Sequence, residues 1–201
     1  WKDYKSERND SDNDTKLNYD LTGHGGGIAF DVDASDNKIV NSNFTDNYAA
    51  LDGASLYFAA ANSNKVTVNN SNFINQASFR NGGAIAFNRV ISSQVMNSNF
   101  TDCYSANGAA IYIAGKDVTV SYSSFISNAA EDDGGAIYWA GANGNVLNCE
   151  FINNTAYGDI KGGGAIYASD SINIKESNFE GNNATYGGAN WNNGSKIKFT
   201  G

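Results

Sequence analysis

A phenylalanine recurs six times along the 201-residue chain, and this repeat restricts the possible folds more than any other feature. The six copies are Phe44, Phe73, Phe100, Phe125, Phe151 and Phe179, at intervals of 29, 27, 25, 26 and 28 residues. A fixed period of roughly 20 to 50 residues indicates a repeat architecture, in which each unit stacks on its neighbours. The chain therefore contains about six copies of one unit of roughly 27 residues.

Other side chains keep a constant place relative to each phenylalanine. Three residues after it stand Asn47, Gln76, Cys103, Asn128, Asn154 and Asn182, and two residues before it stand Ser42, Ser71, Ser98, Ser123, Cys149 and Ser177. About a dozen residues further on, a glycine-rich motif reads Gly-Gly-Ala-Ile at 82–85, 134–137 and 163–166. Short β-branched strands such as 66–68 and 172–174 lie between these landmarks.

The pattern predicts an all-β fold, a right-handed single-stranded parallel β-helix of about six to seven coils over residues 23–201, with the last coil incomplete. Helices are excluded because glycines interrupt every unit and no segment keeps a period of about 3.6 residues. In a β-helix like residues stack about 4.8 Å apart, so we expect a ladder of the six phenylalanines with Asn47, Asn128, Asn154 and Asn182 beside it. Right-handedness follows from the rule for parallel crossovers.

Residues 1–22 lie outside the repeat and carry charges of both signs. An uncovered first coil would expose apolar groups and unpaired backbone donors, which repeat proteins avoid with capping segments. We therefore expect residues 1–22 to flank or cap the open first coil.

Gly-Gly-Ala-Ile followed in the next unit by Phe-x-x-Asn resembles the repeats of chlamydial polymorphic outer-membrane proteins. It is also similar to the asparagine-rich adhesin-like proteins of methanogenic archaea. The resemblance covers roughly residues 23 to 190, and Gln76 and Cys103 depart from its asparagine position. It implies an extracellular, cell-surface protein that attaches to other surfaces, and it implies no catalytic residue.

Charge and hydropathy exclude several partners. The formal net charge is -8 and no basic stretch occurs, which argues against nucleic acid or an anionic membrane as partner. No run approaches the roughly 18 apolar residues that a spanning helix needs, so we expect no membrane insertion of this segment. The resemblance to surface proteins instead implies a glycan or a surface protein of a neighbouring cell as partner.

An enzyme is the main alternative, because parallel β-helices also host polygalacturonases and pectate lyases, and fold alone does not decide function. Gly23-His24-Gly25 resembles the Gly-His-Gly element of polygalacturonases, but that family's other elements do not stand in order around it. Glycosidases need paired carboxylates, and pectate lyases need acidic calcium ligands beside a basic residue. We therefore expect no catalytic residue, and His24 is interpreted as a surface residue in the first glycine turn.

Metal and cysteine chemistry has few candidates. We expect no cofactor except, at most, calcium, and the best candidate ligands are Asp31, Asp33 and Asp36. The acidic groups at 10–14 and 131–133 are interpreted as solvated loops. Cys103 and Cys149 stand two units apart, about 9.6 Å along the axis, which is beyond disulfide reach. Both cysteines are therefore expected to be free, buried and inert.

Eight Asn-x-Ser/Thr sequences could accept glycans if the producing cell glycosylates exported proteins. They begin at Asn9, Asn13, Asn43, Asn69, Asn99, Asn153, Asn183 and Asn193. We expect modification only where these asparagines lie in exposed turns.

One row of tyrosines is the candidate contact surface. In the strand after each glycine motif, the residue between two inward side chains is Ala29, Tyr57, Ala86, Tyr112, Tyr138 or Tyr167. Alternation places this row on the outer face, where Tyr57, Tyr112, Tyr138 and Tyr167 could stack on sugars or contact a protein. The alternative is that stacked tyrosines only stabilise neighbouring coils. The sequence thus predicts an adhesin segment that binds through this face and loops such as 157–162, or else a purely structural stalk.

Overall fold

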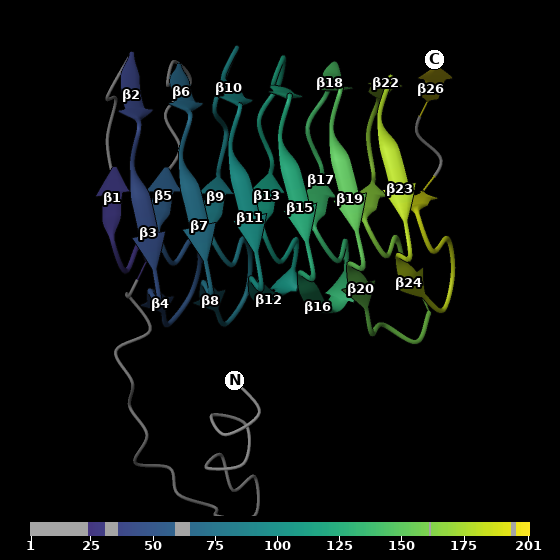
Figure 1. Ribbon diagram of the computed structural model, residues 1–201, viewed down its shortest axis with the longest axis horizontal. Coiled ribbons are helices and arrows are strands. Elements are labelled where there is room, and N and C mark those ends of the chain that lie inside the picture. Colours follow the sequence, from purple (N-terminus) through teal and green to yellow (C-terminus); the bar gives the residue numbers. More distant parts are fainter. Residues whose placement is uncertain (1–23, 31–35, 59–64, 161, 194–195) are drawn as a thin grey trace, which may run out of the picture.

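The computed structural model describes residues 24–30, 36–58, 65–160, 162–193 and 196–201. These form four parallel sheets that run along one axis, one strand of each sheet per coil (Figure 1). Six coils are complete and a seventh has strands in two sheets. This confirms the all-β parallel β-helix. The expected capping segment, residues 1–22, lies outside the described residues.

The strands are short and are named here by sheet. Sheet A contains β1 (Ile28–Phe30), β5 (Leu56–Phe58), β9 (Ile85–Phe87), β13 (Ile111–Ile113), β17 (Ile137–Trp139), β21 (Ile166–Ala168) and β25 (Asn190–Asn192). Sheet B contains β2 (Asn37–Val40), β6 (Val66–Asn69), β10 (Gln94–Met96), β14 (Thr119–Ser121), β18 (Gly144–Leu147), β22 (Ile172–Lys175) and β26 (Ile197–Thr200).

The other two sheets follow in each coil. Sheet C contains β3 (Asn43–Thr45), β7 (Asn72–Ile74), β11 (Asn99–Thr101), β15 (Ser124–Ile126), β19 (Glu150–Ile152) and β23 (Asn178–Glu180). Sheet D contains β4 (Tyr48–Ala49), β8 (Ala77–Ser78), β12 (Tyr104–Asn107), β16 (Ala129–Asp133), β20 (Thr155–Ala156) and β24 (Asn183–Ala184). In Figure 1 the coil advances from left to right while the front strands run down, which is a right-handed coil.

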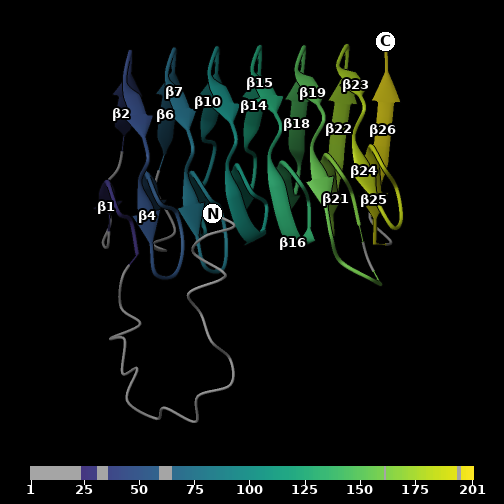
Figure 2. The same ribbon diagram turned by 60° about the horizontal axis from the view of Figure 1, so that its bottom comes forward.

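The phenylalanines form one stack through the interior of sheet C. Successive rings lie 4.7 to 5.0 Å apart between centroids and are nearly parallel. The four inner rings are fully buried, whereas Phe44 and Phe179 at the ends are half-buried. Figure 2 shows the same coils side by side from another direction. The rings stack because the strands pair in register, Phe on Phe, in every coil.

The asparagine column satisfies the backbone where the chain leaves sheet C. Asn128 and Asn154 are fully buried, and each amide nitrogen donates to the carbonyl of a ladder phenylalanine and to the next asparagine. Each side-chain oxygen accepts from the backbone N–H of the preceding member, as Asn154 Oδ1 does from Asn128 at 3.1 Å. Buried amide groups left unpaired would be costly, so this network explains why asparagine recurs.

At the corners between sheets, the backbone adopts the left-handed conformation with positive φ. Between sheets B and C every coil passes through one residue of positive φ, and asparagine tolerates this conformation best among residues with a side chain. Between sheets D and A the corner residue is glycine. At Gly134 (φ 68°) an added Cβ would lie 2.3 Å from the Ile137 carbonyl oxygen, so only glycine fits.

Candidate binding face

A column of mostly polar residues borders the outer face of sheet A at the corner from sheet D. It consists of the residue before each corner glycine, namely His24, Asp52, Asn81, Asn107, Asp133, Gly162 and Tyr186. Bridges between successive coils hold the middle of this corner column in register. Sequence reasoning missed the corner column because its residue types differ, although its place directly before each repeat glycine was visible.

Asp52 is the most strongly engaged side chain of the corner column. It is only 3% exposed, and its carboxylate lies 2.6 Å from Arg80 Nη2 and 3.2 Å from His24 Nδ1. It also accepts from the backbone N–H and the amide of Asn81. His24 stacks on Tyr57 with ring centroids 4.1 Å apart, so the surface histidine expected from the sequence is partly covered.

Within the corner column, the two carboxylates do not have the spacing of a glycosidase pair. The two carboxylates of the corner column, Asp52 and Asp133, stand three coils apart, which is about 14 Å along the axis. Inverting and retaining glycosidases hold their two carboxyl groups about 5 to 9.5 Å apart. Asp52 is instead bound to Arg80 and Asn81, as expected for an ion pair that stabilises the corner.

The tyrosine row is not part of the main hydrophobic cluster, but it is not an open surface either. Tyr57 and Tyr167 are 9% and 1% exposed, and only Tyr112 and Tyr138 are half-buried. The Tyr138 ring stacks on Tyr112 at 5.3 Å and on Tyr167 at 4.6 Å. Because Tyr138 is stacked on both sides and Tyr57 and Tyr167 are buried, these three rings do not offer the flat stacking surface expected from the sequence.

What the tyrosine row does present is phenol hydroxyl groups. Burial, with smaller contributions from Tyr167, Tyr112 and Asp133, raises the pKa of Tyr138 to about 12. Burial, with a contribution from Asp52, also raises the pKa of Tyr112. A raised pKa keeps both phenols protonated at physiological pH, so they act as neutral hydrogen-bond donors and acceptors.

A hollow of about 300 Å³ opens beside Tyr138, at the loop that the sequence singled out. It is lined by Asn107, Asp132, Asp133, Tyr138, Gly158, Asp159 and Ile160. The Gly158 N–H donates to the Asp132 carbonyl at 3.1 Å, and an added Cβ would lie 2.5 Å from that oxygen, so glycine is needed to seat the loop. Ile160, which lines the hollow, is 81% exposed, and Tyr157, the residue before the lining Gly158, is 63% exposed.

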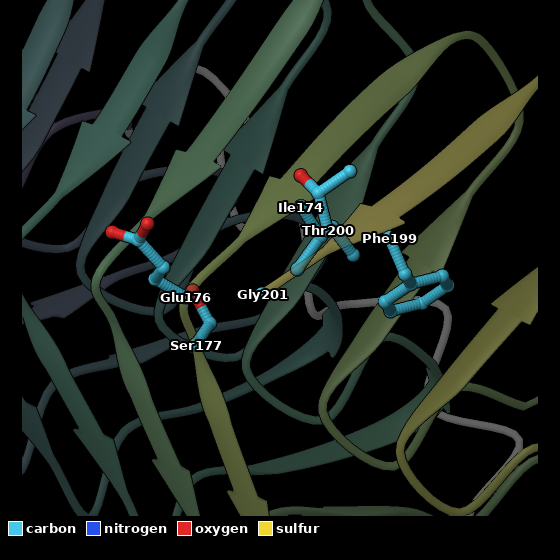
Figure 3. Close-up of a pocket in the computed structure, with 6 residues that line it drawn as sticks. All are labelled: Ile174, Glu176, Ser177, Phe199, Thr200 and Gly201. Carbon is cyan, nitrogen blue, oxygen red and sulfur yellow. The ribbon is translucent and has the colours of Figure 1, made fainter.

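A second hollow of about 370 Å³ lies against the last coil. Figure 3 shows its six lining residues, with Glu176 and Ser177 together, Ile174 close to Thr200, and Gly201 between these two groups. Glu176 and Phe199 are exposed, and the backbone N–H of Glu176 donates to the Thr200 carbonyl. Glu176 is the one charged side chain among the residues that line this hollow, so the hollow does not indicate a function.

Of the three candidate calcium ligands, only Asp36 lies among the residues that the structure describes. Asp31 and Asp33 lie outside the described residues, and Asp36 is an exposed corner residue with φ of 58°. In the described part of the chain no three acidic, histidine or cysteine side chains converge as metal ligands would. The acidic group at 131–133 is not a loop: it ends strand β16, where Glu131 accepts from the Tyr104 hydroxyl and Asp133 is buried.

Cys103 and Cys149 are free and buried, as expected. Burial raises the pKa of Cys103 to about 12 and that of Cys149 to about 11. Each thiol lies within 4 Å of two backbone carbonyl oxygens, which fits its place in a polar column.

We expect neither thiol of the folded chain to react with iodoacetamide at pH 8. Only the thiolate is nucleophilic, and a raised pKa keeps the thiol protonated until pH approaches that value. Both thiols should become reactive in denaturant, which intact-mass spectrometry would measure as two added groups. Rapid alkylation of the native chain would contradict the burial of both cysteines.

Stacked coils with matched columns define a β-solenoid repeat protein. The repeat of the Chlamydia polymorphic membrane protein family matches residues 122–138 and 148–169. Each matched segment contains one ladder phenylalanine and one Gly-Gly-Ala-Ile motif. The chain is therefore a β-helix repeat protein like the chlamydial polymorphic membrane proteins. Comparisons with curated proteins and with solved structures found no significant match, and none of them bears on the archaeal resemblance.

Proposed function

We propose that the protein is an extracellular segment of a cell-surface adhesin, which attaches to a glycan or surface protein of a neighbouring cell. The observation that carries this proposal is the hollow beside Tyr138, with the exposed side chain of Ile160 in its lining and that of Tyr157 on the same loop. Large apolar side chains that project from a loop at a concave surface are typical of contact sites. The match to a membrane-protein repeat family supports the surface location. No helix in the described part is long and apolar enough to cross a membrane.

The contact face we propose comprises the outer side of sheet A and the loop at 157–160. The Tyr138 hydroxyl and the Asn107 amide supply hydrogen bonds inside the hollow, and the Tyr112 hydroxyl supplies one in the coil before it. Ile160 and Tyr157 supply apolar contact area on the loop. Each contact is weak, and display of many copies on a cell would add avidity. The proposal includes no catalytic step and no cofactor.

A structural stalk is the second candidate, because the covered faces of the tyrosine row fit a stabilising ladder. A stalk would bind nothing itself, so binding of the isolated chain to a panel of cell surfaces separates the two functions. The absence of binding above background would favour the stalk over the adhesin.

Ile160→Ser is expected to weaken cell binding at least threefold while the free energy of unfolding changes by less than about 0.5 kcal/mol, because exposed side chains contribute little to stability.

By contrast, the double change Tyr112→Ser and Tyr138→Ser should lower the free energy of unfolding by about 1 to 3 kcal/mol, since each ring contact contributes roughly 0.5 to 1.5 kcal/mol beyond burial. Flow cytometry with labelled chain and urea melts would measure both quantities. Unchanged binding by Ile160→Ser would exclude the loop from the contact.

A further inference from the structure

Tyr122 is an exception at the corner between sheets B and C. The corner residues here, called the B–C column, are Asn41, Asn70, Asn97, Tyr122, Asn148 and Glu176, with φ between 49° and 53°. A bulky aromatic residue is unfavourable in left-handed backbone, whereas asparagine adopts it readily. The chain thus places a tyrosine where its own repeat uses asparagine four times.

The strain at Tyr122 is not compensated by burial. The side chain is 63% exposed and makes no ring contact with any aromatic residue that the structure describes. Its backbone N–H donates to the Leu147 carbonyl at 3.0 Å, a contact that any residue at this corner would make. Strained conformations kept without a packing gain are found disproportionately at binding sites.

The neighbours of Tyr122 in the B–C column are neutral amides, and the exposed carboxylate of Glu150 lies in the next coil, two residues after Asn148. Asn97 and Asn148 precede and follow it in the B–C column, each one coil away, or about 4.8 Å along the axis. The Asn97 amide donates to Asn69 in the coil on the far side from Tyr122. The nearest ionised groups of this column, Glu176 and its ion-pair partner Lys175, are two coils away. Unlike the rings of the tyrosine row, the Tyr122 ring has its faces uncovered by other rings.

We propose that Tyr122, with Asn97 and Asn148, forms a second binding site, and that it takes a neutral glycan. A pyranose ring can lay its apolar C–H face on an exposed aromatic ring while its hydroxyls bond to neighbouring amides. The net charge of -8 disfavours acidic glycans at this surface. The site does not depend on the contact face proposed above, because it lies at the B–C corner and shares no residue with that face.

Tyr122→Asn is the decisive variant, because it restores the residue that the column prefers. We expect the melting temperature to stay the same or rise, while affinity for neutral oligosaccharides falls at least tenfold. Tyr122→Phe, which keeps the ring, should bind within about threefold of the original chain. Glu176→Asn changes the same column without touching an aromatic ring, so it should leave binding unchanged.

The measurement uses the full chain on an array of neutral hexose and N-acetylhexosamine oligosaccharides beside uronic acid oligosaccharides, followed by biolayer interferometry with the sugars that bind. Selective binding of neutral sugars that Tyr122→Asn removes would support the site. The proposal is overturned if only acidic sugars or none bind, if Tyr122→Asn binds normally, or if it loses stability together with binding. Ile160→Ser should leave this binding intact, which separates failure here from failure of the contact face.

Discussion

Replacing Phe125 by alanine is expected to lower the free energy of unfolding by roughly 3 to 5 kcal/mol. Phe125 is fully buried in the middle of the phenylalanine stack. Its ring lies 4.9 Å from that of Phe100 and 4.8 Å from that of Phe151, so the truncation removes contacts on both faces. The coils above and below are fixed by backbone pairing and can close the cavity only partly. Urea or guanidinium unfolding followed by circular dichroism would measure the loss.

Phe199→Ala is the matched control for Phe125→Ala. Phe199 is 59% exposed on the last strand, so its truncation should cost less than about 1 kcal/mol. A loss below about 1 kcal/mol for Phe125→Ala as well would mean that the stack is not the core of the protein.

Asn154→Ala is expected to be as damaging, with a loss of about 3 kcal/mol or more. The Asn154 amide donates to the Phe125 carbonyl at 2.9 Å and to Asn182, and its oxygen accepts from both nitrogens of Asn128. Removing it leaves several fully buried polar groups without partners, each at a cost of roughly 1 to 3 kcal/mol. The same unfolding measurement applies.

The adjacent residue provides the control for Asn154. Asn153 is exposed at the corner between sheets C and D, where φ is 55°, so Asn153→Ala loses only its conformational preference, at a cost of about 1 kcal/mol. Equal losses at both positions would show that the buried amide network contributes nothing beyond the general effect of an asparagine at a corner.

The fold could be predicted from the sequence because each coil repeats the same three constraints. A phenylalanine, an asparagine three residues later and a glycine before the next strand mark where the chain packs, bonds and turns. Those constraints are local in sequence and identical in each coil, so their period defines the stacking. Gln76 shows how a departure is absorbed: its longer amide still donates to the Phe44 carbonyl at 3.0 Å and accepts from Asn47.

The site was harder to predict because it depends on relations between coils and not on the period. Alternation predicts Tyr112 and Tyr138 on the outer face, but it could not show that their rings stack face to face. The hollow needs the loop at 157–160 to fold against Asp132, which no repeat position describes. Tyr122 was visible as the residue before the serine column, yet only the positive φ there shows that tyrosine is costly.

The central claim is that each repeat forms one coil stacked in register on the last. The outer face of sheet C has suitable positions for distance measurements, because one column contains Asn43, Asn72, Asn99 and Asn178. Each variant would carry Asn178→Cys and one of Asn43→Cys, Asn72→Cys or Asn99→Cys, in a chain with Cys103→Ser and Cys149→Ser. A spin label would be attached to each of the two introduced thiols. Pulsed electron–electron double resonance should give distances between the two labels that grow by about 4.8 Å per coil, to about 24 Å between positions 43 and 178. Distances that do not increase steadily from 99 to 72 to 43 would contradict the stacked-coil structure.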